Sequence, residues 1–258
     1  MDKGSVTYVE DGPIGHVVFD RPQARNAMTW KMYDELATAC RTISENSDIR
    51  AVTLRGAGGK AFIAGTDIAQ FQEFTDGEDG IEYEKNVEAY LDALVSVPVP
   101  VLAVIEGWTV GGGLAIAAAC DIRIATPDSR FGVPIARTLG NCLSAKNLST
   151  LVSVFGVSRV NRMLLLAEIL DADEAKTAGF LGEIVAADKI TERATEIATT
   201  LSANAPVTLR STKQALARLA TDPAPDDQDL IRQTYGSEDF KSGVKAFVEK
   251  TKPVWTGK

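Results

Sequence analysis

The spacing of apolar and polar residues changes several times along the chain, and each pattern predicts a different element. Two runs rich in β-branched and aromatic residues, 6–10 and 14–19, flank Asp11-Gly12-Pro13 and predict a hairpin. Thr29 precedes residues 30–45, where apolar side chains recur every three or four positions. This periodicity predicts an amphipathic helix with an N-terminal cap.

Strand and helix patterns alternate from residue 51 to residue 125. Apolar runs at 51–56, 101–105 and 121–125 predict strands, and the pattern over 80–96 predicts a helix between the first two of them. Such alternation is typical of βαβ units around a largely parallel sheet.

The acidic, glycine-containing segment 75–80 predicts a mobile surface loop. Beyond residue 144 the pattern is mostly helical, and one helix is expected to start at Ala205-Pro206. The sequence therefore predicts the α/β class, with a core over residues 1–203 and a helical C-terminal region over residues 204–258.

Charge and composition narrow the classes of partner. The chain has 258 residues, is 45% hydrophobic and carries a formal net charge of −8, which argues against nucleic acid or an anionic membrane surface. The longest apolar run, 95–105, contains two prolines and is too short to span a membrane. Three cysteines without a CxxC pair, and no secretory signal, predict a cytoplasmic protein. The single histidine excludes a histidine-rich metal site.

Two glycine-bearing turns carry the strongest functional signal. Gly111-Gly112-Gly113 lies between an apolar strand and an apolar helix, and Gly65 lies in a second strand-to-helix turn over residues 62–68. Each turn can present a free backbone N–H group at the start of its helix. Two such groups that converge on one carbonyl oxygen form an oxyanion hole, which stabilises an enolate or a tetrahedral intermediate.

Five segments of the chain form a recognisable pattern through their order and spacing, although no single segment would identify a family. They are RPQARNAM (21–28), FIAGTDI (62–68), GWTVGGGLAIAAACD (107–121), FGVP (131–134) and AFVEK (246–250). Together they resemble the crotonase, or enoyl-CoA hydratase/isomerase, superfamily over nearly the whole chain. The resemblance implies a crotonase-like spiral of ββα units with a helical C-terminal region, and a coenzyme A thioester as substrate.

By this resemblance, the thioester oxygen binds between the backbone N–H groups of Thr66 and Gly112. The residues implied in coenzyme binding are Ala24, Arg25, Ala64, Gly65, Thr66, Asp67, Ile68, Gly111, Gly112, Phe247 and Lys250. The last two match a C-terminal segment that in relatives sometimes belongs to a neighbouring subunit. Coenzyme A is expected only as part of the substrate, with no permanently bound cofactor and no metal. The C-terminal region is expected to serve assembly into a homotrimer or a dimer of trimers.

The chain departs from the family pattern at the two positions where hydratases carry glutamates. One glutamate follows the triglycine by two residues, and that position is Ala115 here. The second follows the proline of the Phe-Gly-x-Pro motif, and that position is Ile135 here. Water addition needs one group that activates water and one that protonates Cα, and neither side chain can do so. Hydration by a glutamate pair is therefore disfavoured.

A polar loop over residues 135–144 offers other candidate side chains. Arg137 either binds a carboxylate or polar tail of the acyl group or forms a salt bridge between subunits. Asn141 is a candidate to orient a water molecule or a carbonyl group. Cys142 lies near the place of the nucleophile in the family's aryl-CoA dehalogenases, and the competing interpretation is a small buried packing residue.

Several further residues have both a structural and a functional interpretation. For Asp67 we favour helix capping and turn stabilisation over proton transfer. Arg21, Arg25 and Lys60 either bind the coenzyme phosphates or lie on a solvated face. Trp108 either walls the acyl pocket or fills the core. Structural roles are expected for His16, Cys40, Cys120 and Asp121.

We therefore expect an acyl-CoA-processing enzyme of the enoyl-CoA hydratase/isomerase type, with lyase or isomerase chemistry. One alternative is a non-catalytic acyl-CoA-binding protein that lacks both acids. The other is a CoA-thioester hydrolase or C–C lyase that uses the loop from Arg137 to Cys142. The dense polar side chains of that loop argue against binding alone.

Overall fold

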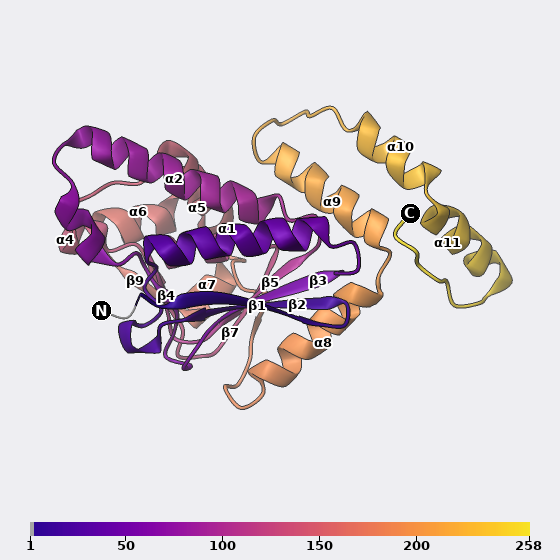
Figure 1. Ribbon diagram of the computed structural model, residues 1–258, viewed down its shortest axis with the longest axis horizontal. Coiled ribbons are helices and arrows are strands. Elements are labelled where there is room, and N and C mark those ends of the chain that lie inside the picture. Colours follow the sequence, from indigo (N-terminus) through magenta and orange to yellow (C-terminus); the bar gives the residue numbers. More distant parts are fainter. Residues whose placement is uncertain (1–2) are drawn as a thin grey trace.

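Two sheets form the centre of the molecule in the computed structural model, which describes residues 3–258 (Figure 1). The six-stranded sheet has the order β1(Ser5–Asp11), β2(Ile14–Asp20), β3(Ala51–Gly56), β5(Val101–Ile105), β7(Ile122–Ala125), β10(Glu183–Ile184). The four-stranded sheet has the order β4(Ala61–Ala64), β6(Trp108–Val110), β8(Arg130–Gly132), β9(Ile169–Asp171). The β1–β2 and β8–β9 pairs are antiparallel, and the other pairs are parallel. The predicted hairpin and largely parallel sheet are confirmed.

Helices cover both faces of the six-stranded sheet. The helices of the described residues are α1(Trp30–Glu45), α2(Gly77–Val95), α3(Gly112–Ala118), α4(Ile135–Thr138), α5(Ala145–Phe155), α6(Val157–Leu165), α7(Ala172–Thr177), α8(Ile190–Ala203), α9(Pro206–Leu219), α10(Gln228–Gly236) and α11(Glu238–Glu249), with the 3₁₀ helices η1(Pro22–Ala24) and η2(Ile68–Glu73). Figure 1 shows α1 beside α2 on one face of the sheet and α8 on the opposite face. Over residues 3–258, no helix combines the length and apolar character needed to cross a bilayer.

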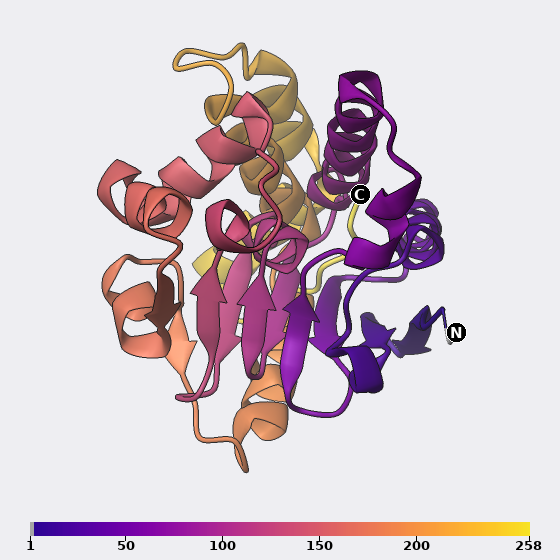
Figure 2. The same cartoon turned by 90° about the vertical axis from the view of Figure 1, so that its left-hand side faces the viewer.

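The chain passes from one sheet to the other within each repeating unit. β3 lies in the six-stranded sheet and β4 in the four-stranded sheet, and α2 follows; β5, β6 and α3 repeat this order. Figure 2 shows the side of the molecule where β4, β6 and β8 run in the same direction. This arrangement is the predicted spiral of ββα units.

The apolar run of β5 explains why that strand is central. Leu102 and Val104 pack with Ile190 of α8, whereas Ala103 and Ile105 join the larger core on the opposite face. A strand that is buried on both faces needs apolar side chains at every position.

The four residues for which structural roles were expected have those roles. Burial raises the pKa of Cys40 to about 11 and that of Cys120 to about 12, so both side chains remain thiols at neutral pH. His16 Nδ1 lies 2.8 Å from Thr53 Oγ1 on the neighbouring strand β3. Asp121 Oδ2 accepts a hydrogen bond from the first backbone N–H of β5 at 2.7 Å.

The segment 75–80 contains the start of α2 rather than the mobile loop that the sequence predicts. Asp76 is the N-cap of this helix, and its side chain accepts from the first turn, while the Asp79 carboxylate accepts from the backbone N–H of Asp76. This reciprocal arrangement is a capping box. It offsets the low helix propensity of Gly77 and Gly80, on which the loop prediction depended.

The C-terminal helices lie at one end of the molecule, and Figure 1 shows α10 and α11 extending away from the sheets. The buried Asp239 carboxylate accepts from the backbone N–H groups of Thr256 and Gly257, at 2.6 Å and 3.1 Å, and so fixes the C-terminal tail against α11. The outer surface of α11 is apolar, because Phe247 is 86% exposed and Val248 is 74% exposed. A single copy of the chain leaves this surface uncovered.

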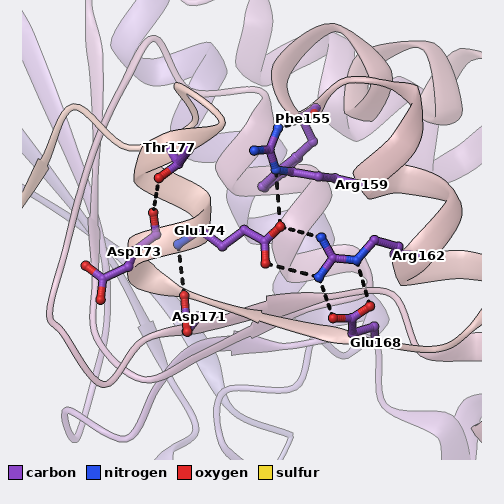
Figure 3. A network of polar contacts seen from close by, with 8 residues as sticks. All are labelled: Phe155, Arg159, Arg162, Glu168, Asp171, Asp173, Glu174 and Thr177. Atoms are coloured by element: carbon purple, nitrogen blue, oxygen red, sulfur yellow. Dashed lines mark hydrogen bonds and ion pairs between the residues drawn. The ribbon is translucent and has the colours of Figure 1, made fainter.

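Arginine and glutamate side chains join α6 to the start of β9 and to α7 (Figure 3). Arg162 donates from Nε to Glu168 Oε2 at 2.8 Å and also pairs with Glu174. Arg159 Nε lies 3.4 Å from Glu174 Oε1. Each pair is partly exposed and contributes little alone, but the shared carboxylate ties two helices together.

Candidate active site

The two glycine turns lie side by side because the strands that precede them are paired. β4 and β6 are parallel neighbours, with Ala64 opposite Val110, so both chains leave the same end of the four-stranded sheet. A Cβ atom on Gly112 would lie 3.9 Å from Thr66 N. The structure thus brings together the two backbone groups that the sequence predicts as a donor pair.

Both N–H groups of this pair remain available to a ligand. Gly112 is the first residue of α3, so its N–H group has no acceptor inside the helix. Over residues 3–258, no protein acceptor takes a hydrogen bond from Thr66 N or Gly112 N. Two unpaired N–H groups at a helix start create a local positive potential that suits an oxygen with negative charge.

Glycine is required in this region for two different reasons. Gly65 and Gly111 have φ values of 89° and 55°, which side chains other than glycine rarely adopt. Gly113 has ordinary helical geometry, but a Cβ there would lie 2.1 Å from the Ile63 carbonyl oxygen. Helix α3 therefore packs directly on the backbone of β4, and this contact fixes the distance between the two turns.

Three hydroxyl groups form a chain next to the donor pair. Tyr33 Oη lies 2.9 Å from Thr66 Oγ1, which lies 3.1 Å from Tyr83 Oη. Tyr33 is 1% exposed, and Thr66 Oγ1 is its hydrogen-bond partner. A buried phenol that only accepted would leave its own proton unsatisfied, so Tyr33 donates to Thr66. Either Thr66 or Tyr83 can be the donor in the second bond, because the threonine oxygen has two acceptor lone pairs.

Both phenols in this chain remain protonated at neutral pH. Burial raises the pKa of Tyr33 well above its ordinary value, and burial likewise raises the pKa of Tyr83. Aromatic rings hold Tyr83 in place: its ring centroid lies 4.9 Å from that of Phe71 and 5.6 Å from that of Trp30. Tyr83 is therefore a protonated hydroxyl group held in one place, and it is a poor base.

Tyr83 borders a cavity of about 820 Å³ between α2 and the loop that precedes α5. The residues that line it are Phe71, Phe74, Gly77, Gly80, Ile81, Tyr83, Glu84, Lys85, Glu88, Leu139, Gly140, Asn141, Cys142, Leu143 and Ser144. Asn141 and Cys142, proposed from the sequence, thus lie in the same cavity as Tyr83. Cys142 is exposed, so its interpretation as a buried packing residue is wrong. Arg137 is exposed on α4 and does not line this cavity.

Ala115 and Ile135, the two positions that lack glutamate, lie in different surroundings. Ala115 borders a separate pocket of about 570 Å³ formed by residues of α2, α3, α5 and α9. Ile135 is half-buried at the start of α4 and packs against the main core. Neither offers a group that can transfer a proton.

Two of the segments implied in coenzyme binding, residues 24–28 and 64–68, lie side by side. Ala64 N donates to Arg25 O at 3.0 Å, and Met28 N donates to Gly65 O at 2.8 Å. These bonds join residues 24–28 to residues 64–68, so Ala24, Thr66, Asp67 and Ile68 belong to the same surface. Phe247 and Lys250 lie elsewhere, because Figure 1 shows α11 far from β4.

The basic residues near this surface differ in exposure. Arg21 is 8% exposed and its guanidinium pairs with Asp67 at 2.8 Å, so a solvated face is ruled out for Arg21. Arg25 and Lys60 are exposed, and the Arg25 guanidinium lies 5.9 Å from the ring centroid of Trp108. Trp108 is itself 37% exposed and does not fill the core.

Asp67 has the capping role favoured by the sequence, since its side chain accepts from Ala69 N at 3.1 Å while it pairs with Arg21. Replacement by asparagine keeps an acceptor for the cap and removes the ion pair, whereas alanine removes both. We expect the free energy of unfolding to fall by about 1 kcal/mol for asparagine and about 2 kcal/mol for alanine. Urea denaturation measures both values, and equal stability of the two variants would contradict the capping role.

The residues that sequence analysis missed are Tyr33, Tyr83 and Glu84. Tyr33 occupies one position in the buried stripe of α1, and Tyr83 and Glu84 are ordinary-looking members of α2. No local motif distinguishes them. Only the contact between α1, α2 and the Thr66 turn gives them a common location.

Comparisons with known proteins place the chain in a family. The family model described as enoyl-CoA hydratase/isomerase matches residues 10–258. The short-chain-enoyl-CoA hydratase of Clostridium acetobutylicum is 31% identical over 256 residues, which cover 98% of this chain and 97% of that protein. An enoyl-CoA hydratase/carnithine racemase structure from Magnetospirillum magneticum has a TM-score of 0.92 at 35% identity and covers 100% of this chain and 97% of that one.

A second solved structure, an enoyl-CoA hydratase from Bacillus anthracis, has a TM-score of 0.87 at 27% identity and covers 100% of both chains. The agreement extends over the ββα core and the C-terminal helices alike. This chain belongs to the enoyl-CoA hydratase/isomerase family of the crotonase superfamily.

Proposed function

We propose that the protein binds the carbonyl oxygen of an acyl-CoA thioester between the backbone N–H groups of Thr66 and Gly112. The observation that carries this proposal is that these neighbouring groups have no protein acceptor within residues 3–258. An oxygen between them gains two hydrogen bonds as its negative charge develops, and an enolate or tetrahedral intermediate is stabilised. Family membership supports a coenzyme A thioester as the source of that oxygen.

The hydroxyl chain favours an enzyme over a protein that only binds acyl-CoA. The chain runs from Tyr33 through the hydroxyl of Thr66, whose N–H is one of the two proposed donors, to Tyr83 at the cavity. We assign the reaction to the lyase or isomerase class, and it does not use a glutamate pair, because Ala115 and Ile135 supply no acid. The position of Asn141 and Cys142 in the adjoining cavity supports one alternative, a CoA-thioester hydrolase or C–C lyase.

Coenzyme A arrives as part of the substrate in this proposal. The joined segments 24–28 and 64–68 support a coenzyme path along the core. The exposed apolar surface of α11, with Phe247 close to Lys250, supports contact with a neighbouring copy in a homotrimer or a dimer of trimers. Region 204–258 then serves assembly, and the net charge of −8 fits a cytoplasmic enzyme of small molecules.

Crotonyl-CoA in heavy water tests the function directly. After incubation with the purified protein, mass spectrometry of every product is expected to detect hydrated product, incorporated deuterium or released coenzyme A. Each of these products identifies one reaction class. Calorimetric titration with crotonyl-CoA and a wider thioester panel measures binding separately.

The two measurements distinguish the alternatives. Binding without any product across the panel would favour the non-catalytic acyl-CoA-binding protein. Absence of binding by every thioester would contradict the assignment of Thr66 and Gly112 to a thioester oxygen.

A further inference from the structure

Glu84 is a carboxylate that borders the large cavity and that the function above does not use. It lies on α2 directly after Tyr83, and both residues line the cavity. Its Oε2 atom accepts from Ser144 N at 2.8 Å and from Asn147 Nδ2 at 3.4 Å. Over residues 3–258, Oε1 has no hydrogen-bond partner. One carboxylate oxygen is therefore anchored and the other is available.

The surroundings of Glu84 suit proton transfer. Burial raises its pKa above the ordinary value, and Glu88 one turn along α2 raises it further, while the bonds from Ser144 and Asn147 oppose this shift. A carboxyl group shifted toward neutral pH can both take and return a proton. Glu84 directly follows Tyr83, whose hydroxyl is bonded to Thr66, and both residues line the same cavity, so the carboxylate lies near the hydroxyl chain.

Other candidates in the same region fit this role less well. Asp79 does not line this cavity, and its Oδ2 atom accepts from the backbone N–H groups of Thr75 and Asp76 at the start of α2. Cys142 is a lone exposed thiol, and over residues 3–258 no hydrogen bond joins it to a group that could take its proton. Ala115 and Ile135 carry no titratable group.

We propose that Glu84 is the proton-transfer residue of this site, acting on the α-carbon of an acyl thioester held as described under the proposed function. Its carboxylate takes the α-proton, and the C–H electron pair moves into the thioester to form an enolate. The enolate oxygen is held by Thr66 N and Gly112 N. The resulting carboxylic acid then returns a proton, or a deuteron acquired from solvent, to the same carbon, so the cycle is balanced and redox-neutral.

The test is α-proton exchange of butyryl-CoA and phenylacetyl-CoA in heavy water. Glu84→Gln is nearly isosteric and keeps an oxygen that can accept from Ser144 N. We expect it to exchange at least about 100-fold more slowly than the wild type while its thioester Kd changes less than about threefold. Glu82→Gln is the matched control, because it removes the same charge from an exposed position of the same helix that does not line this cavity, and it is expected to exchange at close to the wild-type rate. Glu84→Asp retains the carboxyl group and is expected to recover part of the rate.

Each result decides the question. Exchange by Glu84→Gln at the wild-type rate, or an equal loss in Glu84→Gln and Glu82→Gln, would overturn the role of Glu84. Wild-type protein that binds both thioesters but exchanges neither would also overturn it and would leave the binding function intact. Wild-type protein that binds neither thioester would overturn the binding function and the role of Glu84 together.

Discussion

Replacement of Gly112 by proline is expected to lower turnover of the thioester by about 100- to 1,000-fold. Proline removes the N–H group that we assign to the developing oxyanion, and loss of one such donor typically has this effect. Gly112 is the first residue of α3, where proline is tolerated because the N–H group has no role in the helix. Steady-state kinetics with the thioester identified in heavy water measures the change.

Alanine at the same position is the matched control. A Cβ atom on residue 112 would lie 2.6 Å from Tyr33 Oη, so both variants disturb that hydroxyl, but only proline lacks the N–H group. The proline variant is expected to lose far more activity than the alanine variant. Equal losses would mean that the hydroxyl displacement, and not the donor, accounts for the effect.

Replacement of Gly107 by alanine is expected to lower the free energy of unfolding by about 2–5 kcal/mol. Gly107 connects β5 to β6, where the chain passes between the two sheets, and its φ is 66°. A Cβ atom there would lie 2.1 Å from the Lys60 carbonyl oxygen. That oxygen accepts from Trp108 N and cannot move without breaking the bond. Chemical denaturation measures the loss.

Gly236→Ala provides the comparison, because a Cβ at Gly236 meets no atom within 4 Å. This variant in α10 is expected to be as stable as the wild type or slightly more so. A similar loss at both positions would contradict the steric explanation for Gly107.

The location of the site could be predicted from the sequence because glycines mark the turns that form it. Gly65 and Gly111 indicate backbone conformations that few other residues adopt, and each follows an apolar strand. Parallel strands end at the same edge of a sheet, so the two turns were expected to meet. These local signals indicated the two turns, and the family resemblance then assigned Thr66 and Gly112 as the two residues whose N–H groups hold the oxygen.

The side chains around the site could not be predicted in the same way. Tyr33, Tyr83 and Glu84 belong to helices whose apolar periodicity explains each position without any function. Their proximity depends on how α1 and α2 pack, which is a contact between distant segments. The exposure of Cys142 likewise depends on the course of a loop whose composition fits a buried or an open position equally well.

The direct packing of Gly113 on Ile63 separates what is fixed in this molecule from what is replaceable. The spacing of the two N–H donors is set by backbone atoms of β4 and α3, and side-chain substitutions on α2 do not alter it. A designer can therefore exchange acids, bases or nucleophiles along the cavity-facing side of α2 and keep the same pair of backbone N–H groups. The same independence allows a lineage to change its reaction by substitutions on one helix, without rebuilding the sheet that supports the chemistry.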